Sequence, residues 1–137
     1  MKDISLDYLA GFLDGDGCFM LQNTIGKTRV PCIVVGMAST PLQLELLQML
    51  YEKYGGVMGK YGPYKWDTPK ARGRILWRLG HQKAASLSRE LLPYLRIKHR
   101  QAKILIRYAE LMKANRGQGS RYEKPESIEE KKKLFDE

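Results

Sequence analysis

Two glycine-rich breaks divide this chain into helix–strand–strand units, and their order constrains the fold more than any other feature. Gly15 and Gly17 end an expected helix over 6–14, and Gly55–Gly56 end a second. Two runs rich in β-branched or alternating apolar residues follow each break, which predicts two strands after each helix. The four expected strands cover 18–25, 30–37, 57–61 and 74–79.

Two more helices are expected after the last strand, over 81–92 and 97–113. The predicted order is therefore helix, two strands, helix, two strands and two helices, which indicates an α+β fold. A length of 137 residues is typical of one domain. We expect the core to cover 1–113 and the remainder, 114–137, to be a basic linker followed by a short C-terminal helix.

Composition indicates an anionic partner. Lys and Arg number 24 against 15 Asp and Glu, a net charge of +9, which is typical of proteins that bind nucleic acid or an acidic membrane. No apolar run reaches the length of a transmembrane helix and the N-terminus is unlike a signal peptide, so we expect an intracellular protein without a membrane partner. The two cysteines and two histidines are too widely spaced for a zinc finger. The sequence lacks a phosphate-binding glycine loop, so we expect no organic cofactor.

The most informative segment is Leu9-Ala-Gly-Phe-Leu-Asp-Gly-Asp-Gly17. It places Ala10, Gly11 and Gly15 in or beside a helix, although glycine costs about 1 kcal/mol in a helix interior. Small residues on one stripe allow two helices to approach closely, which gives these glycines a purpose.

Asp14 and Asp16 fall where the first helix ends. The carbonyls there are unpaired and the helix dipole is negative, so acidic residues are unfavourable unless a cation binds. The Asp16 carboxylate and the Gly15 carbonyl supply hard oxygen ligands suited to Mg²⁺. The alternative from the residues alone is a pair of solvated acids in a glycine-rich turn.

This segment closely resembles the motif of the LAGLIDADG homing endonucleases, with six of nine letters identical. The segment Leu92-Pro-Tyr-Leu-Arg-Ile-Lys98 also looks like the family's late segment that carries an active-site lysine, and the resemblance extends to about Met112. It implies an αββαββα core in which helices back a four-stranded antiparallel DNA-binding sheet, with the C-terminal helical tail outside it. It also implies a site-specific, Mg²⁺-dependent enzyme that hydrolyses both strands of double-stranded DNA and leaves 3′ overhangs.

The chain carries one copy of the motif. Single-motif members of the family are homodimers, so the resemblance implies a two-fold dimer acting on a long pseudo-palindromic site. The motif helix would supply the dimer interface through Leu9, Ala10, Gly11 and Leu13. The two Asp16 side chains would meet at the two-fold axis, where Mg²⁺ (or Mn²⁺ or Ca²⁺ in its place) offsets their repulsion.

Three further residues are candidates for the catalytic centre. Lys98 extends the inward stripe of the last helix by one step of four, so we expect it to point toward the body of the protein. By resemblance it is the basic residue of the active site, although a lysine that snorkels at a helix start is the alternative. The family often has a polar residue and then a basic one where this chain has Ser39 and Gln43, so its metal–water network departs from the common pattern.

The sheet is expected to read DNA in the major groove. On the fourth strand, the side chains of Arg74 and Arg78 should lie opposite those of Ile75 and Trp77, because side chains alternate along a strand. Turn residues are expected to reach backbone phosphates. The predicted DNA contacts are Gln22, Thr24, Lys27, Arg29, Lys60, Tyr64, Lys65, Lys70, Arg72, Arg74 and Arg78.

Two alternatives use the same scaffold without cutting DNA. One is a maturase that binds intron RNA, and the other is a non-catalytic DNA-binding regulator. Neither has the same need for Asp16, so the acidic residue favours the endonuclease.

Overall fold

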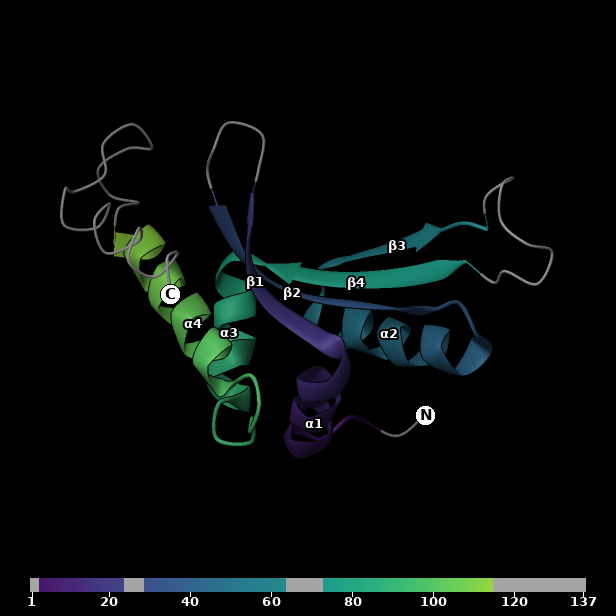
Figure 1. Cartoon of the computed structure of the whole chain (residues 1–137), viewed down its shortest axis with the longest axis horizontal. Coiled ribbons are helices and arrows are strands. Elements are labelled where there is room, and N and C mark those ends of the chain that lie inside the picture. Colours follow the sequence, from purple (N-terminus) through teal and green to yellow (C-terminus); the bar gives the residue numbers. More distant parts are fainter. Residues whose placement is uncertain (1–2, 24–28, 64–72, 115–137) are drawn as a thin grey trace.

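The computed structural model describes residues 3–23, 29–63 and 73–114. Along the chain these form α1 (Leu6–Asp16), β1 (Gly17–Asn23), β2 (Arg29–Ala38), α2 (Pro41–Tyr54), β3 (Val57–Tyr61), β4 (Arg74–Gly80), α3 (His81–Leu91) and α4 (His99–Ala114) (Figure 1). The order confirms the α+β fold and the αββαββα core.

The strands form one antiparallel sheet in the order β1-β2-β4-β3. Each αββ unit contributes a neighbouring pair of strands, and β2 joins the two pairs by lying against β4. Val35 lies opposite Trp77 in this central pair. The antiparallel four-stranded sheet expected for this chain is confirmed.

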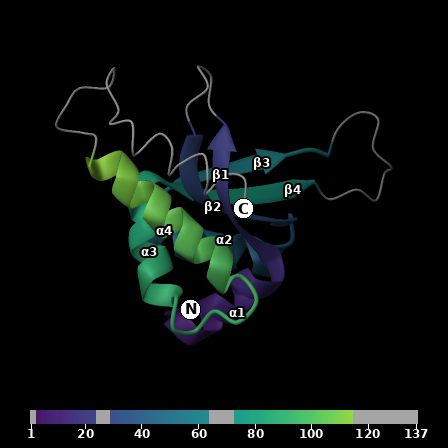
Figure 2. The ribbon, with the colours of Figure 1, turned by 60° about the vertical axis from the view of Figure 1, so that its left-hand side comes forward.

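The helices lie on one side of the sheet and leave the other side open (Figures 1 and 2). Ile75, Trp77 and Leu79 of β4 are buried on the helix side, as their alternation predicted. They join Ile33 and Val35 of β2 in a core that α1, α2, α3 and α4 complete. Burial of such a face is the main stabilising term of the fold.

The break at Gly55–Gly56 is required by the backbone. Both residues have positive φ, of 81° and 90°, which disfavours any residue with a Cβ. A Cβ on Gly56 would also lie 2.3 Å from the carbonyl oxygen of Arg78. The Gly55 carbonyl accepts a hydrogen bond of 2.8 Å from the indole N–H of Trp77, so this break also satisfies a buried polar group of the core.

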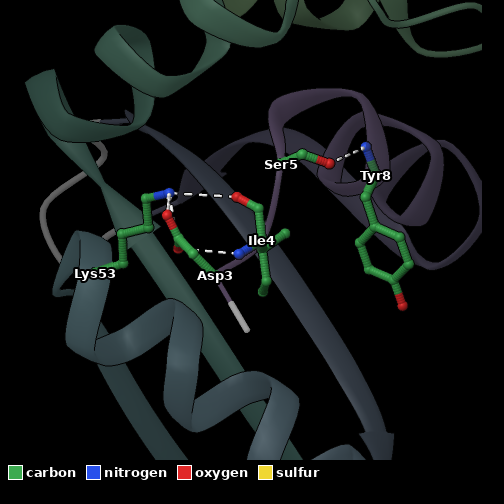
Figure 3. Close-up of polar contacts among 5 residues, drawn as sticks. All are labelled: Asp3, Ile4, Ser5, Tyr8 and Lys53. Carbon is green, nitrogen blue, oxygen red and sulfur yellow. Dashed lines mark hydrogen bonds and ion pairs between the residues drawn. The ribbon is translucent and has the colours of Figure 1, made fainter. Parts of the chain in front are cut away.

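The start of α1 agrees with expectation, and its end does not. Ser5 caps the helix by accepting from the backbone N–H of Tyr8, and the carboxylate of Asp3 bonds Lys53 of α2 at 3.0 Å (Figure 3). However, α1 continues through Asp16 and ends at Gly17, two residues later than predicted. Gly15 therefore lies inside the last turn of the helix.

No capping box forms at the start of α2. Pro41 occupies the first turn, and the side chain of Thr40 makes no cap hydrogen bond. Its hydroxyl is buried without a hydrogen-bond partner. Gln43 therefore has no reciprocal capping role with Thr40 and is left for another surface.

The last helix begins after Lys98, two residues later than predicted. Its buried residues are Ala102, Leu105, Tyr108, Ala109 and Leu111, whereas Met112 is only half-buried. No helix within 3–23, 29–63 or 73–114 is long and apolar enough to cross a membrane. The expected linker and terminal helix fall outside the described residues, apart from Ala114, which ends α4.

Candidate functional site

The two acids of α1 have different environments. The Asp14 carboxylate accepts three backbone N–H groups from the segment that leads into α4: Arg96 at 2.8 Å, Ile97 at 3.2 Å and Lys98 at 2.9 Å. Partial burial opposes the charge of Asp14, but these hydrogen bonds and the nearby Lys98 charge outweigh it and hold the pKa of the carboxyl below its usual range. Asp14 is thus an anchor between two segments rather than a free cation ligand.

Asp16 is exposed and is hydrogen-bonded to no residue in the described part of the chain. It lies in an open hollow of about 300 Å³. The hollow is lined by Asp16, Gly36, Met37, Ala38, Gln43 and Arg74. The fold therefore brings together three of the predicted site residues, from the end of α1, the start of α2 and the start of β4.

A glycine lets the Arg74 side chain lie across the sheet. A Cβ on Gly36 would lie 3.3 Å from Nη2 of Arg74, so any larger residue would press on the guanidinium. The hollow thus combines a carboxylate, an amide and a guanidinium. This set supplies a cation ligand together with hydrogen-bond donors for a phosphate oxygen.

The described residues contain no group of three or more His, Cys, Asp or Glu side chains that could hold a metal ion. Asp16 brings one carboxylate, and Gly15 lies in the last helical turn, where carbonyls have no intrahelical donor. These hard oxygens fit Mg²⁺ or Ca²⁺, but they are too few to complete a shell of six or more. The remaining ligands would have to come from water, a phosphate or a second chain.

Lys98 points inward, as predicted, but from the residue before α4. Its ammonium donates to the carbonyl oxygens of Leu13, at 3.0 Å, and Gly17. The polar partner that an inward lysine requires is thus the carbonyl end of α1, where a cation is favoured. Lys98 stands next to the turn that carries Asp16.

Ser39 does not line the hollow. It follows β2 directly, and its backbone N–H donates to the carbonyl of Gly73 at 3.1 Å. The structure brings Gln43 to the Asp16 hollow and leaves Ser39 outside it.

The open face of the sheet carries the predicted Gln22, Arg74 and Arg78. Arg74 and Arg78 lie on the side opposite Trp77, and Arg78 donates to the side-chain oxygen of Gln22 at 2.8 Å. Between the two arginines the same face presents Leu76 and, opposite it on β2, Gly36, while Val34 lies opposite Arg78. The described part of this face therefore has an apolar middle with polar ends.

Two residues that were expected in turns, and there to contact DNA, lie in strands instead. Lys60 lies within β3 rather than in a turn, and it is paired with Ile75, so its side chain is on the helix-covered side. Arg29 begins β2 opposite Asn23 and, by alternation, shares the side of Ile33. Thr24, Lys27, Tyr64, Lys65, Lys70 and Arg72 lie outside the described residues.

The predicted dimer residues divide into two groups. Leu9, Ala10 and Leu13 are at most 1% exposed, because their side chains fill the core of this chain, and their place in a dimer interface stays a prediction. Gly11 is exposed, with open space around the position of a Cβ. The exposed residues of α1 include Tyr8, Gly11 and Gly15, which follow one another at about one helical turn.

Sequence reasoning missed a second hollow, of about 560 Å³, at the other end of the open face. Its lining includes Gln22, Cys32, Arg78 and the first turn of α3. No local pattern pointed to it, because its walls come from all four strands and α3. The positive φ of His81, 60°, at its rim is likewise a product of the tertiary structure.

No protein-family model and no curated protein matches this sequence. Solved structures do match the fold. The homing endonuclease I-CvuI, solved in complex with I-CreI target DNA, superposes with a TM-score of 0.70 at 21% identity, over 96% of this chain and 77% of I-CvuI. The LAGLIDADG homing endonuclease I-GzeII, in complex with its DNA target, gives 0.67 at 15% identity, over 98% of this chain and 43% of I-GzeII.

I-SmaMI, bound to uncleaved DNA in the presence of calcium ions, gives a TM-score of 0.66 at 14% identity, over 95% of this chain and 43% of I-SmaMI. This chain therefore spans less than half the length of I-GzeII and I-SmaMI. The order of elements, the antiparallel sheet and these superpositions lead to one conclusion: the chain has the fold of the LAGLIDADG homing endonucleases.

Proposed function

We propose that this protein is a homing endonuclease that cuts both strands of a long, roughly palindromic DNA site as a homodimer and requires a divalent metal ion. One observation carries the proposal: Asp16 has no structural partner in the described chain and lies in a hollow with Gln43 and Arg74. An acid at a helix C-terminus opposes the helix dipole. Since the fold makes no use of Asp16, a ligand is its best explanation.

Duplex DNA is the substrate class that suits the open face. An antiparallel sheet fits the major groove, and this sheet presents Gln22, Arg74 and Arg78 on its uncovered side. The chain's charge of +9 favours a polyanion. The similar proteins I-CvuI, I-SmaMI and I-GzeII were each solved with DNA, which supports the same partner here.

The metal ligands would be the Asp16 carboxylate and the Gly15 carbonyl. A bound Mg²⁺ would polarise a phosphate oxygen and lower the pKa of a coordinated water. Arg74 and Gln43 would hold the phosphate in the hollow by donating hydrogen bonds to its oxygens. Lys98 would keep the end of α1, and with it Asp16, in a fixed position while placing a positive charge beside the site.

A homodimer would complete this site. One carboxylate supplies too few ligands and too little negative charge for a divalent ion. Two copies of α1 packed together would bring a second Asp16 carboxylate to the site. The exposed face of α1 is suited to that contact because Gly11 and Gly15 leave room for a second helix.

The maturase and regulator alternatives remain outcomes of a direct test. We would select cleaved molecules from a randomised duplex library with Mg²⁺, sequence the cut ends, and then assay the recovered site with wild-type protein and Asp16→Asn. The expected result is a roughly palindromic site with 3′ overhangs, cut by wild type and bound but not cut by Asp16→Asn. Cleavage by Asp16→Asn at the wild-type rate would refute the catalytic assignment. Specific binding of RNA without any DNA cleavage would favour the maturase.

A further inference from the structure

Three side chains from three strands meet at one oxygen atom on the open face. The side-chain oxygen of Gln22 (β1) accepts from Nη1 of Arg78 (β4) at 2.8 Å and from Sγ of Cys32 (β2) at 3.6 Å. A guanidinium can only donate, so the atom facing Arg78 must be the amide oxygen rather than the amide nitrogen. The orientation of the Gln22 amide is therefore fixed by its neighbour.

Cys32 can serve as a donor because it stays protonated. Burial raises the pKa of its thiol to about 11, against the opposing effect of the Arg78 charge, so the S–H is retained at neutral pH. An amide oxygen has two lone pairs. Arg78 and Cys32 occupy both, which leaves Gln22 with no free acceptor on its side chain.

What remains free in this cluster is a set of donors. The Gln22 amide keeps its two N–H groups and Arg78 keeps four of its five, since no other acceptor among the described residues bonds them. Both residues line the hollow of about 560 Å³, so space for a ligand lies directly beside them.

The other residues that line the hollow offer few hydrogen-bond acceptors. Val30, Val57 and Leu79 contribute apolar walls, and the lining contains no Asp or Glu. His81 is the exception, with one accepting nitrogen when neutral. Its two ring nitrogens point away from each other, so it cannot contact two neighbouring atoms of one base edge.

We propose that Gln22 and Arg78, with Cys32 behind them, form a guanine-reading site of the sheet. Guanine presents only acceptors, N7 and O6, on its own part of the major-groove edge, which a donor-only cluster matches. Glutamine ordinarily reads adenine by donating to N7 and accepting from N6, but here the required carbonyl is already occupied. This inference rests on the proposed DNA-binding function and adds the base and the residues that select it.

The test measures base preference at the position that Arg78 contacts. Each base pair of the selected half-site is varied, and binding is measured for wild type, Arg78→Ala and Gln22→Glu. We expect wild type to prefer guanine at one position per half-site by about 5- to 150-fold, the range of a good bidentate contact. Arg78→Ala should abolish this preference. Gln22→Glu has the same shape but adds free acceptors, so it should weaken the guanine preference and improve binding of adenine or cytosine there.

A modified base gives an independent readout. Replacing that guanine by 7-deazaguanine removes the N7 acceptor without changing Watson–Crick pairing. It should weaken binding by wild type and leave binding by Arg78→Ala unchanged. Arg89→Ala is the matched control, because it removes one arginine from the helix side, where Arg89 pairs with Glu110, and should keep the guanine preference.

The outcomes separate this inference from the proposed function. If wild type binds selectively but Arg78 and Gln22 affect no guanine position, or Gln22 selects adenine, the guanine site is overturned while DNA binding stands. If wild type prefers no DNA sequence over another, the proposed function fails and this inference fails with it.

Discussion

Asp14 and Lys98 join α1 to the start of α4 in both directions. The Asp14 carboxylate accepts from the backbone N–H of Lys98 at 2.9 Å, while the Lys98 ammonium donates to the carbonyls of Leu13 and Gly17, on either side of the two acids. Each charged side chain thereby bonds backbone groups of the other segment. The turn that carries Asp16 is held from both ends by this pair.

Loss of the Asp14 charge should destabilise the fold in a pH-dependent way. Asp14→Asn removes charge-assisted hydrogen bonds and should lower the free energy of unfolding by about 1–3 kcal/mol at neutral pH. The folded pKa of Asp14 lies below its ordinary value of 3.8, so its stabilisation is present above that value and is lost as the pH falls through the folded pKa. Urea unfolding should therefore show a difference between wild type and Asp14→Asn at pH 7 that shrinks below about pH 3.8. An equal difference at both pH values would mean that the charge is not responsible.

Lys98→Ala should affect the chemical step more than binding. It leaves the carbonyls of Leu13 and Gly17 without their cation and loosens the turn that holds Asp16. We expect single-turnover cleavage of bound DNA to slow at least tenfold, with a loss of about 1–2 kcal/mol in stability. If Lys98→Ala instead weakens binding and leaves the cleavage step unchanged, the lysine is only a phosphate contact.

Gly36→Ala should impair cleavage through Arg74. The added methyl group would lie 3.3 Å from Nη2 of Arg74 and push the guanidinium away from the Asp16 hollow. We expect a several-fold fall in the cleavage rate, since small displacements at a reacting centre are costly. A double-mutant cycle checks the route: in an Arg74→Ala background, Gly36→Ala should have no further effect on the rate. An undiminished effect in that background would show that Gly36 acts by another path.

Gly11→Leu should weaken the dimer without destabilising the single chain. A side chain at Gly11 meets open space within the chain and replaces a poor helix former, so stability of the single chain should not fall. The same side chain would block a close contact between two copies of α1. Sedimentation equilibrium should show a dimer for wild type and a shift toward monomer for Gly11→Leu.

Gln101→Leu, at an exposed position of α4, is the control for added apolar surface and should stay dimeric. Wild-type protein that is monomeric at concentrations where it cuts both strands would exclude the dimer.

The sequence by itself determined the order of elements. Glycine breaks, a Ser5 cap and the alternation of Ile75, Trp77 and Leu79 are local signals, and local sterics and periodicity set them. The resemblance of residues 9–17 to a known motif also singled out Asp16. The sequence did not determine where helices end, because residues such as Asp14 and Gly15 can adopt either a helical or a turn conformation. Contact with another segment of the chain stabilises one of these conformations.

Only the tertiary structure decided which polar groups have partners. Asp14 and Asp16 are two residues apart and look alike in sequence, yet one binds three N–H groups of a segment more than eighty residues away and the other binds none in the described chain. The same holds for Gln22, whose chemistry depends on Arg78 and Cys32 from other strands. Strand pairing also places Lys60 on the helix side of the sheet, where it remains exposed, and packing buries Leu9, Ala10 and Leu13. Long-range contacts, rather than local pattern, determine these positions.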